Sequence, residues 1–382
     1  MPIGVIGETA GRLSTSEKYD GRIGTASVAP SFDEFARLSK GNRNMTMRRL
    51  RGAWLGVAIA VGAVVAGGSA RAEVRELKIA IQYGLGYLPL MVAKNRGLIE
   101  KHAAALGAGP VTVHWTVVNG GVATNDALLS GNAHIAAAGI APLLTIWDKT
   151  RGGLNVKALA GLDSSAFWLN SNNPKVRSIR DLTDRDRIAV PAVKVSINSV
   201  VLQIAAEQAF GPGHHYDLEP LTTTLSPPEA TAALVSGKTE ITGHVTSPTY
   251  GSQQLAYPNV HRILTSRDVI GEATMVLAYA TQTFHDENPK VVAAVLGALR
   301  DGFALIERDK DEAARIYLAE ESSRLAHADV VALLNNPDIS YSLVPHNTRV
   351  IADFMHRVGS LKNKPDSWRD YIFPALHAEA GS

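Results

Sequence analysis

The feature that most constrains the fold is an alternation, from Glu73 onward, of short apolar runs with helical stretches. Residues 77–82 and 111–118 favour strands, and residues 89–101 favour a helix with Pro89 in its first turn. Parallel strands need a crossover connection that is usually a helix, so this order predicts βαβ units around a largely parallel sheet. The expected fold class is therefore α/β.

The alternation continues along the chain and then gives way to helices. We expect further strands at residues 134–138, 156–161, 188–190, 218–222, 241–245 and 274–280. We expect helices at residues 122–129, 197–210 and 228–235, one that begins at Pro142, and a final series at residues 289–308, 311–320, 328–334 and 347–358. The C-terminal segment should therefore be mainly helical.

A five-residue sequence motif occurs twice, each time between an expected helix and an expected strand. Ala-Leu-Leu-Ser-Gly at residues 127–131 and Ala-Leu-Val-Ser-Gly at residues 233–237 each lie between an expected helix and an expected strand. This repetition predicts two similar α/β lobes with a cleft between them. We place the first lobe at residues 74–165 plus 266–382 and the second at residues 166–265, joined by two crossings.

The N-terminal 72 residues have the pattern of a targeting segment. Three arginines at positions 48, 49 and 51 precede an uncharged run at residues 53–66, which is followed by Ala70-Arg71-Ala72. This pattern predicts a secretory signal peptide at residues 45–72, cleaved after Ala72, and a periplasmic protein. The run is shorter than the ~20 apolar residues of a membrane-spanning helix, so a retained anchor is the weaker alternative. Residues 1–44 are then an upstream extension assigned in error.

Composition excludes several classes of function. The 38 Lys and Arg residues nearly balance the 36 Asp and Glu residues, so no strong positive field indicates nucleic-acid binding. Cysteine is absent, which excludes disulfides, thiolate metal sites and cysteine nucleophiles. Gly84-Leu85-Gly86 lacks the third glycine of a dinucleotide-binding loop, because Pro89 stands at that position. We predict no cofactor.

Catalytic motifs are also lacking. His214-His215 lie in a glycine-rich loop, where a solvated pair is favoured over a metal site because no third ligand has a recognisable spacing. The sequence contains no His-Glu-x-x-His pattern and no Gly-x-Ser-x-Gly elbow, and few acidic residues stand at the expected strand ends. We predict no catalytic residue and no metal site.

Candidate ligand-binding residues lie at the expected junctions between strands and helices. Asn119-Gly120-Gly121 follows one strand, so its backbone N–H groups can bind a polar ligand, although a plain tight turn explains it equally well. Gly139-Ile140 occupies the next such junction and is open to the same two interpretations. In an open parallel sheet, ligands gather at the carboxyl ends of the strands.

Aromatic and hydroxyl side chains add to this set. Tyr83 and Tyr87 flank the turn after the first strand, where they either line a pocket or pack on the core. Ser196 precedes an expected helix and either caps it or faces the cleft together with Asn198.

The order of these segments resembles one family, the nitrate, aliphatic sulfonate and taurine type of periplasmic substrate-binding proteins of ABC importers, which is related to the NMT1-like domain. The resemblance extends from about Leu77 to Val358. The matching stretches, in order, are residues 79–83, 89–94, 97–100, 120–121, 126–131, 139–142, 179–182, 188–191 and 232–237.

The resemblance implies a two-lobe periplasmic-binding-protein fold of type II, in which each lobe is a mixed, mainly parallel sheet flanked by helices. It implies a non-catalytic, monomeric protein that captures a small polar or anionic organic solute between the lobes and delivers it to a membrane permease and its ATPase. It places the ligand near Tyr83, Asn119, Gly120, Gly121, Gly139, Ile140, Ser196, Thr246 and Ser247.

Two positions depart from the family's pattern for sulfonates. Ile140 stands where an acidic residue is often found, and residues 245–250 replace a Trp-Asp-Pro-Tyr-like segment. An organic acid or a heterocycle therefore remains open as the ligand. The alternatives in function are an NMT1-like enzyme acting on a pyrimidine precursor and a periplasmic sensory module.

Overall fold

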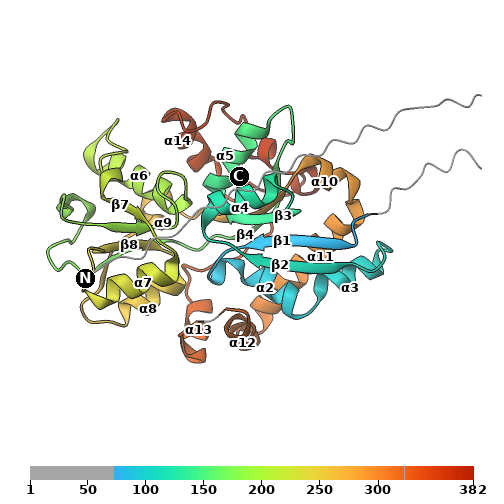
Figure 1. Cartoon of the computed structure of the whole chain (residues 1–382), viewed down its shortest axis with the longest axis horizontal. Helices are drawn as coiled ribbons and strands as arrows, with labels where there is room; N and C mark the ends of the chain where they lie inside the picture. Colours follow the sequence, from blue (N-terminus) through green and yellow to red (C-terminus); the bar gives the residue numbers. More distant parts are fainter. Residues whose placement is uncertain (1–72, 322) are drawn as a thin grey trace, which may run out of the picture. The chain divides into compact units, whose positions relative to one another are not determined.

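The computed structural model describes residues 73–321 and 323–382. Within them the chain forms two five-stranded sheets, each flanked by helices (Figure 1). The predicted α/β class is confirmed. The predicted signal peptide and upstream extension lie outside the described residues.

The first sheet has the strand order β2-β1-β3-β10-β4. Strands β2, β1 and β3 pair in parallel, and β10 runs antiparallel to both of its neighbours. The sheet is therefore mixed, as predicted. Its strands are β1 (Glu76–Ile81), β2 (Thr112–Val117), β3 (Ile135–Gly139), β4 (Lys157–Asp163) and β10 (Val276–Ala280).

The second sheet repeats this arrangement in the order β7-β6-β8-β5-β9. Strands β7, β6 and β8 are parallel, and β5 runs antiparallel to β8 and β9. The strand that runs against the others is thus the fourth in both sheets. The strands are β5 (Trp168–Ser171), β6 (Ile188–Val190), β7 (Thr222–Thr224), β8 (Gly243–Thr246) and β9 (His261–Thr265).

Helices cover both faces of each sheet. Around the first sheet, α2 (Leu88–Asn95), α3 (Leu98–Ala105) and the 20-residue α11 (Pro289–Arg308) pack together, while α4 (Gly120–Leu129) and α5 (Ile140–Thr150) contact β3 (Figure 1). Around the second sheet, α6 (Ile197–Phe210) packs on α9 (Ser266–Ile270), and α7 (Pro227–Ser236) packs on α8 (Pro248–Leu255).

The C-terminal segment is mainly helical, as expected. It continues from α10 (Gln282–Glu287) and α11 through α12 (Lys310–Glu320) and α13 (His327–Leu334) to α14 (Arg349–Arg357). Short 3₁₀ turns occur at η1 (Leu85–Tyr87), η2 (Ile179–Asp181), η3 (Glu219–Leu221), η4 (Trp368–Tyr371) and η5 (Pro374–Leu376). Helix α12 packs on α2 and α14 packs on α5, so this segment covers both faces of the first sheet.

The chain passes between the sheets twice, along residues 164–167 and residues 266–275. The two crossings are hydrogen-bonded to each other. The backbone N–H of Phe167 donates to Oγ of Ser266 at 2.9 Å, and the N–H of Ser266 donates to the carbonyl of Phe167 at 2.7 Å. Oγ of Ser164 and Oγ1 of Thr274 lie 3.2 Å apart.

Several expected elements differ from the structure. The helix expected at residues 89–101 is divided into α2 and α3, and Gly97, with φ 58°, is the N-cap of α3. The strand expected at residues 218–222 is instead the 3₁₀ turn η3 followed by β7. Strands β5 and β9 are absent from the sequence prediction, and they join the second sheet by antiparallel pairing of β5 with β8 and with β9. In the described part of the chain, no helix is both long enough and apolar enough to span a membrane.

Candidate functional site

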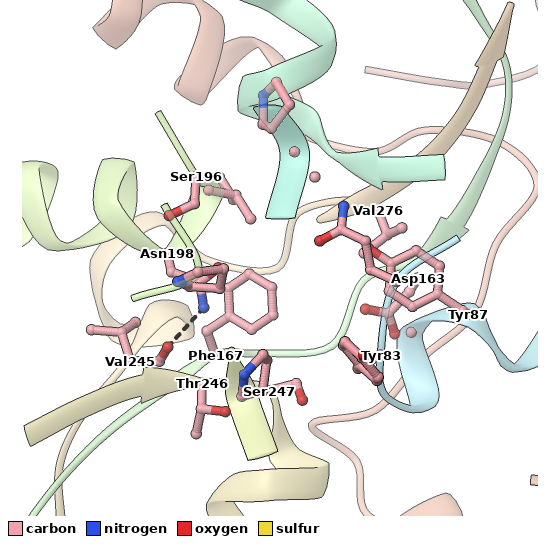
Figure 2. Close-up of a pocket in the computed structure, with 18 of the residues that line it drawn as sticks. Tyr83, Tyr87, Asp163, Phe167, Ser196, Asn198, Val245, Thr246, Ser247 and Val276 are labelled. Atoms are coloured by element: carbon pink, nitrogen blue, oxygen red, sulfur yellow. Dashed lines mark hydrogen bonds between the residues drawn. The ribbon is translucent and has the colours of Figure 1, made fainter. Parts of the chain in front are cut away.

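One pocket is bordered by residues from both sheets and encloses about 680 Å³, including open solvent at its mouth (Figure 2). It lies at the carboxyl ends of β1, β3, β4 and β8, which is the edge where ligands gather in parallel α/β sheets. Its lining residues are Gln82, Tyr83, Gly86, Tyr87, Asn119, Gly121, Gly139, Pro142, Asp163, Phe167, Pro191, Ser196, Ile197, Asn198, Pro227, Val245, Thr246, Ser247 and Val276.

Tyr83 and Tyr87 both border this pocket. Tyr83 is half-buried, and Tyr87 is buried and also belongs to the core of the first sheet. Burial, together with the charges of Asp163 and Glu321, raises the pKa of Tyr87. Tyr87 therefore combines the two roles, packing and pocket lining, that the sequence left open.

Asn119 and Gly121 border the pocket at the start of α4, but Gly120 does not. A Cβ atom on Gly121 would lie 2.1 Å from Cγ of Pro142, so this glycine is required for the contact between α4 and α5. That packing explains the glycine without a ligand.

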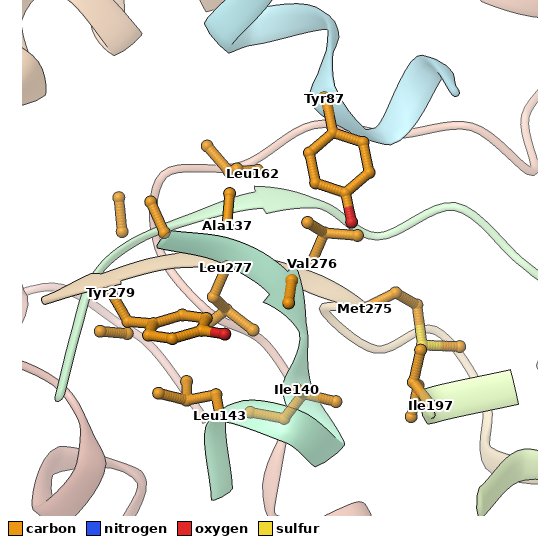
Figure 3. Packing of buried hydrophobic residues seen from close by; sticks show 14 of the residues in the cluster. Tyr87, Ala137, Ile140, Leu143, Leu162, Ile197, Met275, Val276, Leu277 and Tyr279 are labelled. Carbon is orange, nitrogen blue, oxygen red and sulfur yellow. The ribbon is translucent and has the colours of Figure 1, made fainter. Parts of the chain in front are cut away.

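Gly139 borders the pocket, whereas Ile140 lies in the core, with no exposed surface, near Leu143 and Leu277 (Figure 3). The side chain of Ile140 thus packs in the core of the first sheet, and its backbone N–H donates to the carbonyl of Met275 at 2.9 Å. A Cβ atom on Gly139 would lie 2.6 Å from Cγ2 of Ile197. The absence of a side chain thus lets the end of β3 approach the start of α6.

Ser196, Asn198, Thr246 and Ser247 border the pocket from the second sheet. Oγ of Ser196 accepts a hydrogen bond from the N–H of Ser199, so Ser196 caps α6. Nδ2 of Asn198 donates to the carbonyl of Val245 at 2.8 Å. The buried Oγ1 of Thr246 has no hydrogen-bond partner in the described chain.

Asp163 also borders the pocket, and the sequence did not reveal it. The expected strand ended at residue 161, whereas β4 extends to Asp163, which pairs with Val276. The side chain is 2% exposed, and the hydroxyl of Ser165 donates to its Oδ1. Burial raises the pKa of Asp163 to about 7. Had the strand been predicted to extend to residue 163, the sequence would have indicated an acidic residue at this edge of the first sheet.

A second buried carboxylate, Glu321, directly follows α12 and is 8% exposed. It accepts hydrogen bonds from the N–H of Gly84 at 2.6 Å, the hydroxyl of Tyr250 at 2.7 Å and the hydroxyl of Tyr317 at 3.0 Å. Tyr250 lies on α8, beside the second sheet, and Gly84 follows β1 of the first. Glu321 therefore connects the two halves of the structure away from the chain crossings.

The histidines lie outside the pocket. His214 pairs with Asp217 at 2.8 Å on the surface, in keeping with a solvated position. His244 is fully buried beside Gln254, and burial lowers the pKa of His244 to about 3. Among the described residues, no group of three or more His, Asp or Glu side chains is arranged to hold a metal ion.

Solved structures establish what this architecture is. No protein-family model and no curated protein matches the sequence. The periplasmic aliphatic sulphonate-binding protein of Escherichia coli is similar with a TM-score of 0.59 and 19% identity, over 79% of this chain and 92% of that one. The periplasmic nitrate-binding protein of Synechocystis PCC 6803 is similar with a TM-score of 0.62 and 15% identity, over 78% and 84% of the two chains.

The chain has the periplasmic-binding-protein fold. A ligand-binding component of an ABC-type import system from Staphylococcus aureus, solved with zinc bound, is also similar, with a TM-score of 0.61 and 18% identity over 81% of this chain and 99% of that one. The resemblance found in the sequence is thus confirmed as a likeness of fold.

Proposed function

We propose that this protein is the solute-binding component of an ABC importer, which captures a small organic solute and presents it to a membrane permease and its ATPase. The observation that carries the proposal is the pocket itself, which takes its lining from the strand ends of both sheets. A solute bound there contacts both halves at once, so binding favours their closed arrangement. The fold shared with import components of known transporters supports the same role.

We propose that the parts that move relative to each other are the two lobes expected from the sequence. Residues 74–165 with 266–382 form one lobe and residues 166–265 form the other. The two crossings, hydrogen-bonded to each other at Phe167 and Ser266, are the natural hinge. Small-angle X-ray scattering with and without a bound solute should show a smaller radius of gyration in the complex, and an unchanged radius would contradict closure.

The proposed role is binding without chemical change, by a monomer. The pocket contains one carboxylate, Asp163, and no Lys, Arg or His side chain. A general acid–base pair is therefore lacking among its described lining residues. The alternative, an enzyme acting on a pyrimidine precursor, predicts that a bound compound is consumed.

The experiment is a thermal-shift screen of small organic solutes, followed by calorimetric titration of each compound that stabilises the protein. A solute at 100 times its Kd should stabilise the folded state by about 2.7 kcal/mol, which gives a clear rise in Tm. Recovery of the compound unchanged, in one-to-one stoichiometry, is the expected result. Conversion of the compound would favour the enzyme. Failure of the protein to bind any pure solute or any component of a cell extract would overturn the proposal.

The proposed location is the periplasm, with the signal peptide at residues 45–72 removed. Arg48, Arg49 and Arg51, the apolar run and the Ala70-Arg71-Ala72 segment support it. N-terminal sequencing of the exported protein should give Glu73 as the first residue. Finding Met1 in the exported protein would contradict both the cleavage after Ala72 and the interpretation of residues 1–44 as an extension assigned in error.

A further inference from the structure

The carboxylate of Asp163 is buried in the pocket with few hydrogen-bond donors. Within the described chain, its carboxylate receives hydrogen bonds only from Ser165, through the hydroxyl and the backbone N–H. A Cβ atom built on Gly86 would lie 3.1 Å from Oδ2, so the turn after β1 approaches this oxygen closely. An ionised carboxylate removed from water is costly unless it is paired with a cation or fully hydrogen-bonded. Within the described chain, the buried carboxylate of Asp163 therefore lacks a cation or further hydrogen-bond donors that would offset its removal from water.

None of the described side chains that line the pocket is a cation that could pair with the carboxylate of Asp163. Among the described lining residues, Asp163 has the one carboxyl group, there is no Lys, Arg or His side chain, and the others are amides, hydroxyls, aromatic rings and apolar groups. Burial, the largest cause, raises the pKa of Asp163 to about 7, and no neighbouring cation offsets this effect. At neutral pH the carboxyl group of Asp163 in the empty pocket is thus only partly ionised, and a bound cation would favour its ionised form.

The surrounding rings suit a cation as well. Tyr83, Tyr87 and Phe167 border the same pocket as Asp163 (Figure 2). Aromatic faces attract ammonium and guanidinium groups, and more strongly where water is excluded. A simple anion at this place would instead meet the negative faces of the rings and the charge of Asp163.

We propose that the captured solute carries a protonated nitrogen, an amine, an amidine or a guanidine, that binds the carboxylate of Asp163 beside Tyr83 and Tyr87. This inference rests on the proposed function and names the class of its solute. It differs from the nitrate and sulphonate that appear in the names of the similar structures. The remainder of the solute faces the hydroxyl of Thr246, which is buried and unpartnered in the described chain.

The first experiment identifies the solute by capture. The purified full chain is incubated with a small-molecule extract of the cells, and the complex is examined by native mass spectrometry. The captured compound is then released and identified. We expect a compound with a nitrogen that is protonated at neutral pH. A captured compound without such a nitrogen would overturn the inference and leave the proposed function intact, whereas capture of nothing would overturn the proposed function itself.

The second experiment uses matched probes that differ only in this nitrogen. Pairs such as 4-(aminomethyl)benzoate with 4-(hydroxymethyl)benzoate, and taurine with isethionate, are titrated together with nitrate and ethanesulfonate. The amine member of a pair should bind at least tenfold more tightly than the hydroxyl member. Equal binding of both members, or preference for the plain anions, would contradict a cation at Asp163.

The third experiment removes the carboxylate. Asp163→Asn should weaken binding of the captured compound by 100-fold or more, because it keeps the shape of the side chain and loses the charge. The matched control is Glu240→Gln, which makes the same change of charge on an exposed side chain between α7 and β8 and should leave binding within twofold. Unchanged affinity in Asp163→Asn would overturn the inference, and the chemistry of the captured compound tests it without any variant.

Discussion

Two buried carboxylates occupy very different surroundings in this protein, Glu321 after α12 and Asp163 at the end of β4. Burial is the largest cause that raises the pKa of each. Glu321 accepts hydrogen bonds from three groups that belong to three separate segments, Gly84, Tyr250 and Tyr317. Asp163 receives them from Ser165 alone within the described chain.

The difference shows how the same chemical group serves structure in one place and binding in another. A buried acceptor that is fully satisfied holds its donors in position, and its loss leaves those donors unpaired. An acceptor that is only partly satisfied raises the free energy of the empty protein, and a ligand with the missing donor lowers it again. Glu321 is of the first kind, and we infer that Asp163 is of the second.

The largest effect is expected at Glu321. Glu321→Ala leaves three donors unpaired, each at a cost of about 1 to 3 kcal/mol, so the free energy of unfolding should fall by about 3 kcal/mol or more. Glu321→Gln keeps one acceptor oxygen and should cost less. Urea denaturation monitored by circular dichroism measures both.

The neighbouring residue supplies the control for this prediction. Glu320 pairs with Lys94 at 2.6 Å nearer the surface, so Glu320→Ala should cost less than about 1 kcal/mol. Equal losses for Glu320→Ala and Glu321→Ala would show that the three hydrogen bonds of Glu321 do not stabilise the fold in the way described.

The opposite sign is expected at Asp163. Its pKa in the folded protein is about 7, above the value of 3.8 for a free carboxyl, so the folded state holds the proton more tightly than the unfolded state. Stability of the empty protein should therefore fall as pH rises between these two values and then stay low. Asp163→Asn removes this loss and should stabilise the empty protein by about 2 to 4 kcal/mol at pH 8.

A series of thermal melts at different pH values checks this prediction. The gain in stability of Asp163→Asn over the natural chain should be present at pH 8 and vanish near pH 4. A variant that is less stable than the natural chain at pH 8 would place Asp163 with Glu321, among the carboxylates that stabilise the fold.

Binding of a cationic solute should show the same titration. At a pH below 7 the empty protein holds the proton on Asp163, so binding must release it and affinity falls. From pH 7.5 to pH 5.5 we expect a loss of about 10- to 30-fold, from the ionised fraction of a group with a pKa of about 7. Tyr87 and Tyr341, whose pKa values the charge of Asp163 helps to raise, stay neutral in this range. Calorimetry in buffers of different ionisation enthalpy also counts the protons released, and affinity independent of pH would contradict the pairing.

The smallest effect is expected at the rim of the pocket. Tyr83 is half-buried, so Tyr83→Ala removes only part of a ring from contact with the solute and should weaken binding by about 1 kcal/mol with little change in stability. Tyr257→Ala, at a side chain that is 47% exposed and outside the pocket, is the control. A large loss of stability in Tyr83→Ala would indicate that the ring serves packing instead.

Local patterns in the sequence predicted much of the fold. The repeated motif that ends in Ser-Gly lies between a helix and a strand in both halves. Helix α4 ends at Leu129 before β3, and α7 ends at Ser236 before β8. Glycine and proline positions identified several helix boundaries, such as the starts of α2 and α11 and the ends of α6 and α7, because their backbone preferences act locally. Most of the predicted ligand-binding residues border one pocket, since the carboxyl ends of parallel strands meet at one edge of a sheet.

The sequence by itself determined the α/β alternation, the helical C-terminal segment and the turn residues at the strand ends, because propensity and periodicity depend on near neighbours along the chain. The tertiary structure alone decided that β5 and β9 join the second sheet, that Ile140 points into the core, and that β4 extends as far as Asp163. Each of these depends on pairing or packing with residues far away in the chain. The charge of the pocket is likewise a tertiary property, since it results from which side chains the two sheets bring together and which they leave without a partner.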